Sequence, residues 1–297
     1  MKVKTIFWND LEGRIRSGWR VLATWLLMLL VFLPIQALVK PMLPGHWTRD
    51  QKIDLLLVCF AVVATVVMWV SRTWIDKRAF VSLGLDTKKW MLKDIAAGYL
   101  ISAILVTTIL VIEMGFGWLS FEIGRVKWLE TIPKIMYLFL VTGLAVAWWE
   151  NLFFVGYLFL NLRDGCGFWW SVILNCLIFG LIHAINPNTS IWAFGGIVLI
   201  HAYEIFGFLK TGNLWLILGI HAGWNFFQGL AGFTVSGRTG IQVLEQTNNT
   251  PAWFGGGKFG PEAGVVMVLT GILAFTLITL YAKWTRKNST TSTNALQ

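Results

Sequence analysis

The chain has 297 residues, of which 56% are hydrophobic and 13% are charged, and its formal net charge is +9. Soluble domains carry about 25% charged residues. A water-soluble fold is therefore excluded, because too few polar side chains are present to cover the apolar surface that 18 Trp and 21 Phe help to build. An α-helical membrane protein fits, since a bilayer is as apolar as these side chains.

The positive charge lies beside the apolar stretches rather than in a separate polar region. In a soluble protein a charge of +9 would suggest nucleic acid as a partner. Here lipid headgroups and membrane topology explain it better, because Lys and Arg flank membrane spans. We expect the lipid bilayer as a partner and no nucleic-acid binding.

Eight stretches are apolar over the roughly 20 residues that cross a bilayer. They predict spanning helices at about residues 18–39, 53–71, 95–114, 135–159, 168–186, 190–209, 213–231 and 264–282. Short polar turns at 161–165 and 210–213 make consecutive helices antiparallel neighbours. The expected fold class is all-α, a polytopic membrane helical bundle of about eight transmembrane helices.

The distribution of Lys and Arg predicts the orientation. With the N-terminus in the cytoplasm, 16 of the 24 basic residues lie on the cytoplasmic side and eight lie outside. The loop from Arg72 to Lys93 alone supplies six of them. We therefore expect a multi-pass protein with both termini in the cytoplasm.

Ionisable side chains at membrane depth are costly, so they mark candidate functional sites. The fourth span carries Glu150, the fifth carries His183, and the seventh carries His221 and Asn225. His221 and Asn225 are four residues apart and share one helix face. Helices of a bundle can bring such groups to one point. These four residues are the candidate catalytic site.

Two kinds of chemistry suit this set. In the first, the carboxylate takes a proton from a water molecule that one imidazole orients. The other His and the Asn amide donate hydrogen bonds to the oxyanion that forms. In the second, Glu150, His183 and His221 hold a divalent metal ion, with zinc as the candidate cofactor. Interhelical hydrogen bonding, or a proton relay in a small transporter, remain as the alternatives.

The sixth span carries a second polar pair, His201 and Glu204, three residues apart on one helix face. The spacing permits a mutual hydrogen bond, which offsets the cost of burying both side chains. The structural interpretation is a self-contained pair, and the functional alternative is a pair that supports the main site.

The polar residues of the core also lie in motifs. They include Phe179-Gly180-Leu181-Ile182-His183 and His221-Ala222-Gly223-Trp224-Asn225, and the chain also contains Thr211-Gly212-Asn213-Leu214-Trp215, Gly260-Pro261-Glu262 and Arg16-Ser17-Gly18-Trp19-Arg20. In these segments, most strongly over about 145–230, the sequence resembles the CPBP intramembrane metalloprotease family. That family includes the type II CAAX prenyl endopeptidases and bacteriocin-immunity proteins.

The resemblance implies that Glu150 is the base that activates water with His183, and that His221 and Asn225 stabilise the oxyanion. The family's first motif, Glu-Glu-x-x-x-Arg, is degenerate here. Aligned on Gly156, its second Glu is Asn151 and its Arg is Val155. The sequence therefore predicts a site with one ionisable carboxylate rather than two, and weaker or altered activity.

The resemblance also divides the chain. Residues 1–134 form N-terminal transmembrane helices with a basic cytoplasmic loop, 135–231 form a CPBP-like catalytic helical core, and 232–297 form a flexible Gly-rich external loop, the last transmembrane helix and a polar tail. The implied function is an intramembrane endopeptidase of the bacterial plasma membrane that cleaves a membrane-associated peptide or protein. The alternative is a catalytically silent relative that binds a membrane peptide or protein, as in immunity.

Overall fold

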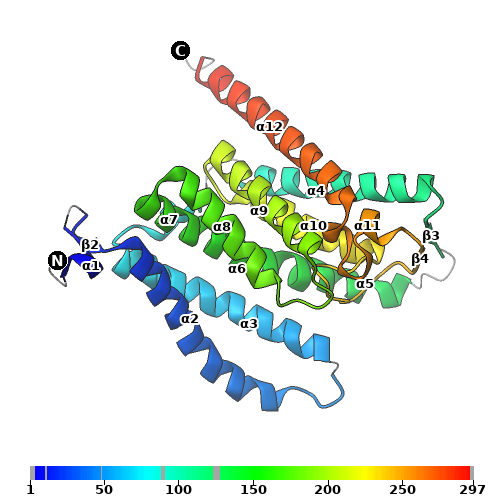
Figure 1. Cartoon of the computed structure of the whole chain (residues 1–297), viewed down its shortest axis with the longest axis horizontal. Coiled ribbons are helices and arrows are strands. Elements are labelled where there is room, and N and C mark those ends of the chain that lie inside the picture. Colours follow the sequence, from blue (N-terminus) through cyan, green and yellow to red (C-terminus); the bar gives the residue numbers. More distant parts are fainter. Residues whose placement is uncertain (1–3, 11, 48, 88–90, 123–127, 295–297) are drawn as a thin grey trace.

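The computed structural model describes residues 4–10, 12–47, 49–87, 91–122 and 128–294. It is built almost entirely of helices (Figure 1). The main α-helices are α2 (Ser17–Val39), α3 (Arg49–Val70), α4 (Met91–Gly115), α8 (Phe168–His183), α9 (Ile191–Thr211), α10 (Trp215–Ala231) and α12 (Val265–Asn294). Two short helices are α1 (Lys4–Phe7) and α11 (Ala252–Gly255).

One long helix contains both α-helical and π-helical turns. It runs through α5 (Trp128–Tyr137), η5 (Leu138–Ala145), α6 (Val146–Glu150), η6 (Asn151–Leu158) and α7 (Phe159–Cys166), of which η5 and η6 are π-helical. Single π-turns inside helices often mark functional sites. Here π-helical segments lie on both sides of α6, which ends at Glu150.

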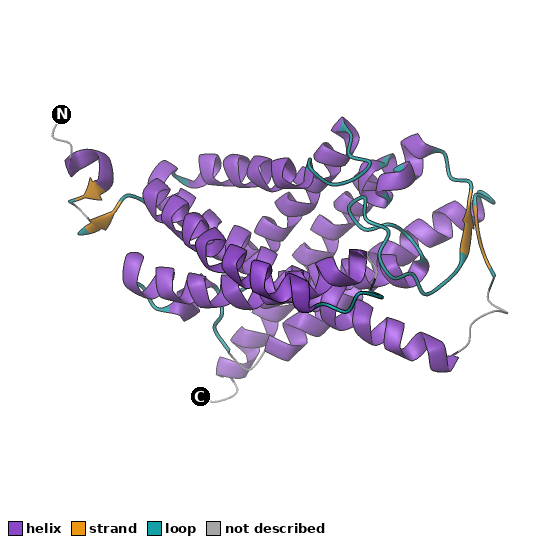
Figure 2. Ribbon diagram, turned by 90° about the horizontal axis from the view of Figure 1, so that it is seen from below, coloured by secondary structure: helices purple, strands orange, loops and turns teal. Residues whose placement is uncertain are grey.

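Two short antiparallel strand pairs lie at opposite ends of the bundle (Figures 1 and 2). The strands β1 (Trp8–Asn9) and β2 (Arg14–Ile15) pair beside the start of α2. The strands β3 (Leu119–Phe121) and β4 (Gln246–Asn248) join segments far apart in the sequence. The last turns of α12 point back toward the end that carries β1 and β2 (Figures 1 and 2).

The predicted fold class is confirmed, and every predicted span coincides with a helix. Among the described residues, six helical stretches are long and apolar enough to cross a membrane, and α8 is a shorter apolar helix. The six are Ser17–Met42, Leu55–Ile75, Met91–Gly115, Leu129–Cys166, Ile191–Thr211 and Val265–Thr285. The remaining predicted span, the seventh, is α10, which is 17 residues long and carries polar side chains. The count of eight spans stays a prediction.

Helix α10 lies at the centre of the bundle, and all of its residues from 215 to 225 are buried. Small residues bring it close to α4. A Cβ atom on Gly219 would overlap the Ile95 carbonyl, and one on Gly98 would overlap the Leu216 carbonyl. Ser102 Oγ also donates a hydrogen bond of 2.5 Å to the Ile220 carbonyl oxygen. Such close packing of small residues is typical of membrane helices, and here it fixes the helix that carries His221 and Asn225.

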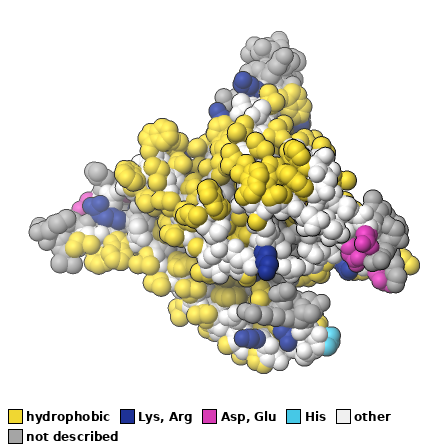
Figure 3. Space-filling view, turned by 45° about the vertical axis from the view of Figure 1, so that its right-hand side comes forward, with side chains coloured by type: hydrophobic (Ala, Val, Ile, Leu, Met, Phe, Trp, Pro, Cys, Tyr) yellow, Lys and Arg dark blue, Asp and Glu magenta, His cyan; other side chains and the backbone are white. Residues whose placement is uncertain are grey.

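The outer surface of the helices is strongly hydrophobic (Figure 3). Large apolar side chains on it are well exposed, including Leu30 at 70%, Leu38 at 72% and Leu100 at 62%. Exposed apolar area of this extent is costly in water and favourable in lipid. The hydrophobic surface therefore agrees with an integral membrane protein.

The predicted topology can be tested by cysteine labelling in a variant whose native cysteines are replaced by alanine. Asn249→Cys in the loop and Lys283→Cys near the end of α12 both lie at exposed positions. We expect a membrane-impermeant maleimide to label position 249 from outside intact cells and position 283 only after lysis. Labelling of both positions from the same side would contradict the predicted span count or orientation.

Candidate active site

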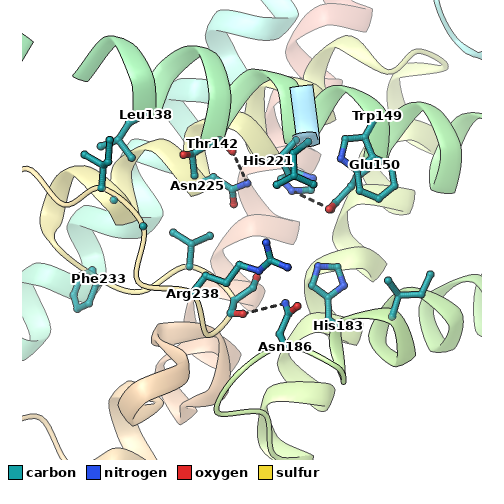
Figure 4. Close-up of a pocket in the computed structure, with 18 of the residues that line it drawn as sticks. Leu138, Thr142, Trp149, Glu150, His183, Asn186, His221, Asn225, Phe233 and Arg238 are labelled. Atoms are coloured by element: carbon teal, nitrogen blue, oxygen red, sulfur yellow. Dashed lines mark hydrogen bonds and ion pairs between the residues drawn. The ribbon is translucent and has the colours of Figure 1, made fainter. Parts of the chain in front are cut away.

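The four predicted site residues line one cavity inside the bundle (Figure 4). Its volume is about 210 Å³. Glu150 comes from the end of α6, His183 from the end of α8, and His221 and Asn225 from α10. The rest of the wall is mostly apolar, with side chains such as Leu138, Trp149, Ile182 and Phe233. The predicted convergence of the four residues is thus present in the structure.

Glu150 faces His221. Its Oε2 atom lies 3.6 Å from His221 Nε2, and the two side chains are 10% and 9% exposed. His183 lies on another part of the cavity wall (Figure 4). Within the described part of the chain, no hydrogen bond or ion pair joins Glu150 to His183. The carboxylate therefore lies closer to the imidazole expected to stabilise the oxyanion than to the one expected to orient water.

A second carboxylate contacts His221 from the other side. Glu204 Oε1, on α9, lies 2.9 Å from His221 Nδ1. Each ring nitrogen of His221 thus faces a carboxylate oxygen, and the Glu204 side chain is only 1% exposed. This arrangement fixes the ring orientation and favours an imidazole that carries a proton on Nδ1. Among the described residues Glu150 is the one carboxylate on the cavity wall, and Glu204 is a further carboxylate that contacts His221 without lining that cavity.

The predicted pair of His201 and Glu204 is confirmed. His201 Nδ1 lies 3.0 Å from Glu204 Oε2, and His201 Nε2 lies 2.6 Å from Asn175 Oδ1. The His201 ring also stacks on Phe179 with the ring centroids 4.1 Å apart. Because Glu204 contacts His221 as well, the pair is not self-contained. It forms a buried chain of contacts from Asn175 on α8 to His221 on α10.

Backbone hydrogen bonds hold the other two site residues. His183 Nδ1 lies 2.9 Å from the Phe179 carbonyl oxygen, so Nδ1 is the protonated donor in the neutral ring and Nε2 is free to accept. Asn225 Nδ2 donates to the Thr142 carbonyl oxygen at 3.2 Å. The Phe179-to-His183 spacing therefore has a structural reason, since Phe179 accepts from His183 and stacks on His201.

The segment 257–263 reaches into the bundle beside the site. Glu262 is 2% exposed, and its Oε1 accepts from Trp224 Nε1 at 2.9 Å and from Gln228 Nε2 at 3.2 Å. Gly196 on α9 lacks a side chain where one would overlap the Glu262 carbonyl. The expected flexible loop is therefore, in this part, packed against α9 and α10 through specific contacts.

The predicted metal set does not fit a catalytic zinc in this arrangement. Such sites take three protein ligands. Across the described residues, no three His, Cys, Asp or Glu side chains are placed to hold a metal ion. Of the predicted set, Glu150 and His221 lie 3.6 Å apart, and His183 lines the same cavity without a hydrogen bond or ion pair to either among the described residues. Zinc stays a prediction, which elemental analysis of the purified protein tests.

The two altered positions of the first motif are both buried. Asn151 is 2% exposed and its Nδ2 lies 3.4 Å from the Ile217 carbonyl oxygen. Val155 is 0% exposed. Both residues face the bundle interior, where a Glu and an Arg would have to pair with each other. Neither residue lines the cavity that contains Glu150.

The comparison with known families concerns this core. Residues 132–227 match the family model described as Type II CAAX prenyl endopeptidase Rce1-like. The Rce1-like segment, as we call residues 132–227, covers about a third of the chain. It contains all four predicted site residues and Glu204, and it confirms the resemblance that the motifs indicate. A search of curated proteins and a search of solved structures each found no match.

Two residues near the site were not among the four predicted catalytic residues. Glu204 contacts His221 directly, which agrees with the alternative interpretation that the pair of His201 and Glu204 supports the main site. Glu262 was placed in an external loop. A signal for Glu262 did exist, because Trp224 and Gln228 are two side-chain donors four residues apart on one face of α10, and buried donors require acceptors.

Proposed function

We propose that the protein is an intramembrane endopeptidase in which Glu150 activates water. The observation that carries the proposal is the convergence of Glu150, His183, His221 and Asn225 on one cavity inside a helical bundle. The match of the surrounding segment to the Rce1-like family model supports the same reaction class. A carboxylate, two imidazoles and an amide are the groups that peptide hydrolysis by general base catalysis needs.

The first step is attack by water on the scissile carbonyl carbon. Glu150 takes one proton from the water while a new C–O bond forms. His183 orients the water, because its Nε2 can accept the second hydrogen while Nδ1 donates to the Phe179 carbonyl oxygen. A base of this kind contributes roughly 10²- to 10⁴-fold to the rate.

The second step is collapse of the tetrahedral intermediate. The oxyanion accepts hydrogen bonds from His221 Nε2–H and from the Asn225 amide. Glu204 holds the other ring nitrogen of His221 at 2.9 Å and balances the charge when both nitrogens carry protons. Glu150 then returns its proton to the leaving amine as the C–N bond breaks. The products are a carboxylic acid and an amine.

The surroundings of the cavity indicate the kind of substrate. Its wall is mainly apolar and lies between membrane helices, so it suits a peptide bond near a membrane-embedded end of a membrane-associated peptide or protein. We place the enzyme in the bacterial plasma membrane with both termini in the cytoplasm. A prenyl group on the substrate is compatible with the apolar wall but is not required by the mechanism.

The second candidate function is a catalytically silent protein that binds a membrane peptide or protein. The altered first motif favours it, because Asn151 and Val155 replace a charged pair. Such a protein would use the same cavity for binding and would not cleave its ligand.

The two candidates are separated by a cleavage assay. The purified chain, reconstituted in lipid vesicles, is mixed with single-span peptides that carry fluorescent tags at both ends, with and without a C-terminal prenyl-cysteine sequence. The endopeptidase is expected to separate the tags at one site. Saturable binding of a peptide that stays intact over many hours would support the silent protein instead.

The role of Glu204 gives a separate prediction. Glu204→Gln keeps an acceptor oxygen for His221 but removes the negative charge, so we expect kcat to fall at least about tenfold with little change in KM. His201→Gln is the matched control, since it changes the same buried chain of contacts without touching His221. Full activity in a folded Glu204→Gln variant would show that Glu204 acts only in packing.

A further inference from the structure

The N-terminal end of α2 contains an arginine that has no hydrogen-bonded partner. Arg20 is 0% exposed, and among the described residues its Nε, Nη1 and Nη2 atoms make no hydrogen bond. Its closest carboxylate oxygens belong to Glu12 and Asp164, both 3.6 Å from Nη2, and to Asp76, 3.8 Å from Nη1. A buried guanidinium with five N–H donors and no acceptor at hydrogen-bond distance is costly.

The three carboxylates near Arg20 already accept hydrogen bonds from other arginines. Glu12 accepts from Arg14 at 2.7 Å, Asp76 accepts from Arg72 at 2.8 Å, and Asp164 accepts from Arg14 at 3.1 Å and Arg78 at 2.8 Å. Around these three carboxylates there are thus four guanidinium groups, Arg14, Arg20, Arg72 and Arg78. One positive charge is in excess, and Arg20 is the group without hydrogen bonds.

A cavity of about 450 Å³ lies against Arg20 and the first turn of α2. Its wall includes Ser17, Gly18 and Trp19, whose N–H groups precede the first intrahelical bond, from Arg20 N to the Arg16 carbonyl oxygen. The carboxylates of Glu12 and Asp164 also line the cavity, and both accept hydrogen bonds from Arg14. No side chain among the described residues caps this helix start. Free N–H groups and the positive end of the helix dipole make such a place suitable for an anion.

We propose that this cavity binds the phosphate of a membrane phospholipid. The Arg20 guanidinium forms charge-assisted hydrogen bonds with the phosphate oxygens, and the first-turn N–H groups of α2 complete the site. A lipid fits better than free phosphate, because exposed leucines continue from the cavity along α2. They are Leu22 at 44%, Leu26 at 55%, Leu30 at 70% and Leu33 at 54%.

The exposed Trp19 strengthens the argument for a lipid headgroup. It is 39% exposed, and its Nε1 donates to the Ile6 carbonyl oxygen at 3.0 Å. Tryptophans with one polar contact and an apolar body collect at the level of lipid headgroups. The cavity therefore lies at the level of the lipid headgroups, where the phosphate of a phospholipid lies. The acyl chains of that lipid can extend along the exposed leucines of α2.

The test measures thermal stabilisation of the delipidated full-length protein in detergent by three probes. They are dioleoylphosphatidylglycerol, dioleoylglycerol, which has the same chains without phosphate, and inorganic phosphate. We expect the phospholipid to raise the melting temperature saturably and the other two to have little effect at equal concentration. An equal effect of dioleoylglycerol, or of inorganic phosphate, would overturn the proposed occupant.

Variants locate the site. Arg20→Met should weaken phospholipid binding at least about tenfold, and it should fold because the three carboxylates keep their hydrogen-bonded arginines. Ser17→Pro removes one first-turn N–H at a helix position where proline is well tolerated, and Arg16 already has the extended conformation that precedes proline (φ −63°, ψ 146°). It should weaken binding several-fold.

The matched control is Lys210→Met, which removes one positive charge from the same predicted membrane side but does not line the cavity. It should bind the phospholipid as the wild type does. Unchanged binding in both Arg20→Met and Ser17→Pro would overturn the proposal, and so would an equal loss in Lys210→Met. If Arg20→Met fails to fold, the proposal is tested by comparing Ser17→Pro with Lys210→Met. Weaker phospholipid binding in Ser17→Pro alone would support it, and equal binding in the two variants would overturn it.

Discussion

Glu150→Gln is expected to lower the rate of peptide cleavage by about 10²- to 10⁴-fold while the yield of folded protein stays the same. Gln has the shape of Glu but cannot take up a proton, and the base is worth roughly 10²- to 10⁴-fold. The fold should tolerate the change, because His221 keeps its contact of 2.9 Å with Glu204. Initial rates of tag separation and the elution profile in size-exclusion chromatography measure the two effects.

The control for this variant is Glu113→Gln. Glu113 lies on α4, is 0% exposed and does not line the cavity, so its replacement removes a buried carboxylate from a membrane helix at another place. Cleavage should be close to that of the wild type. If Glu150→Gln cleaves as fast as Glu113→Gln, Glu150 is not the base.

Val155→Arg is expected to abolish the folded protein. The Val155 side chain is 0% exposed, so the new guanidinium would be buried without a partner, at a cost of several kcal/mol. That is a large part of the 5–15 kcal/mol by which proteins are typically stable. Fluorescence-detected size-exclusion chromatography of a tagged variant should show aggregate in place of the monodisperse peak.

The double change Asn151→Glu with Val155→Arg should recover part of the folded yield. It places a carboxylate four residues before the arginine, where the two side chains can pair. The same double variant also measures the effect of the altered motif on activity. If it cleaves faster than the wild type, the wild-type chain is a protease impaired by Asn151 and Val155. If the single Val155→Arg variant folds as well as the double variant, the alignment of the first motif is wrong.

The membrane spans could be predicted from the sequence because each depends on a local run of apolar residues. All eight predicted spans coincide with helices, and the fifth ends early, at His183, before Pro187. The π-helical turns on either side of α6 left no such local signal. Their hydrogen-bond pattern depends on the packing of the long helix against its neighbours.

The four site residues could also be predicted, because polar groups inside apolar spans are rare and two of them repeat at helical spacing. The sequence left open whether His201 and Glu204 support the site, and the contact between Glu204 and His221 could not be predicted. It joins α9 to α10, and the relative rotation of two helices is set by packing that no single span encodes. For the same reason the segment at Glu262 looked like a loop, although its carboxylate is the acceptor for two donors on α10.

The most direct test of the account is mass spectrometry of the products formed by the wild-type chain in H₂¹⁸O. Single-span membrane peptides are incubated with the protein in vesicles, and the fragments are weighed at early times. Because water activated by Glu150 supplies the new oxygen, we expect an N-terminal fragment whose new carboxyl group carries one ¹⁸O atom. Peptides that all remain intact with the folded wild-type protein would contradict it.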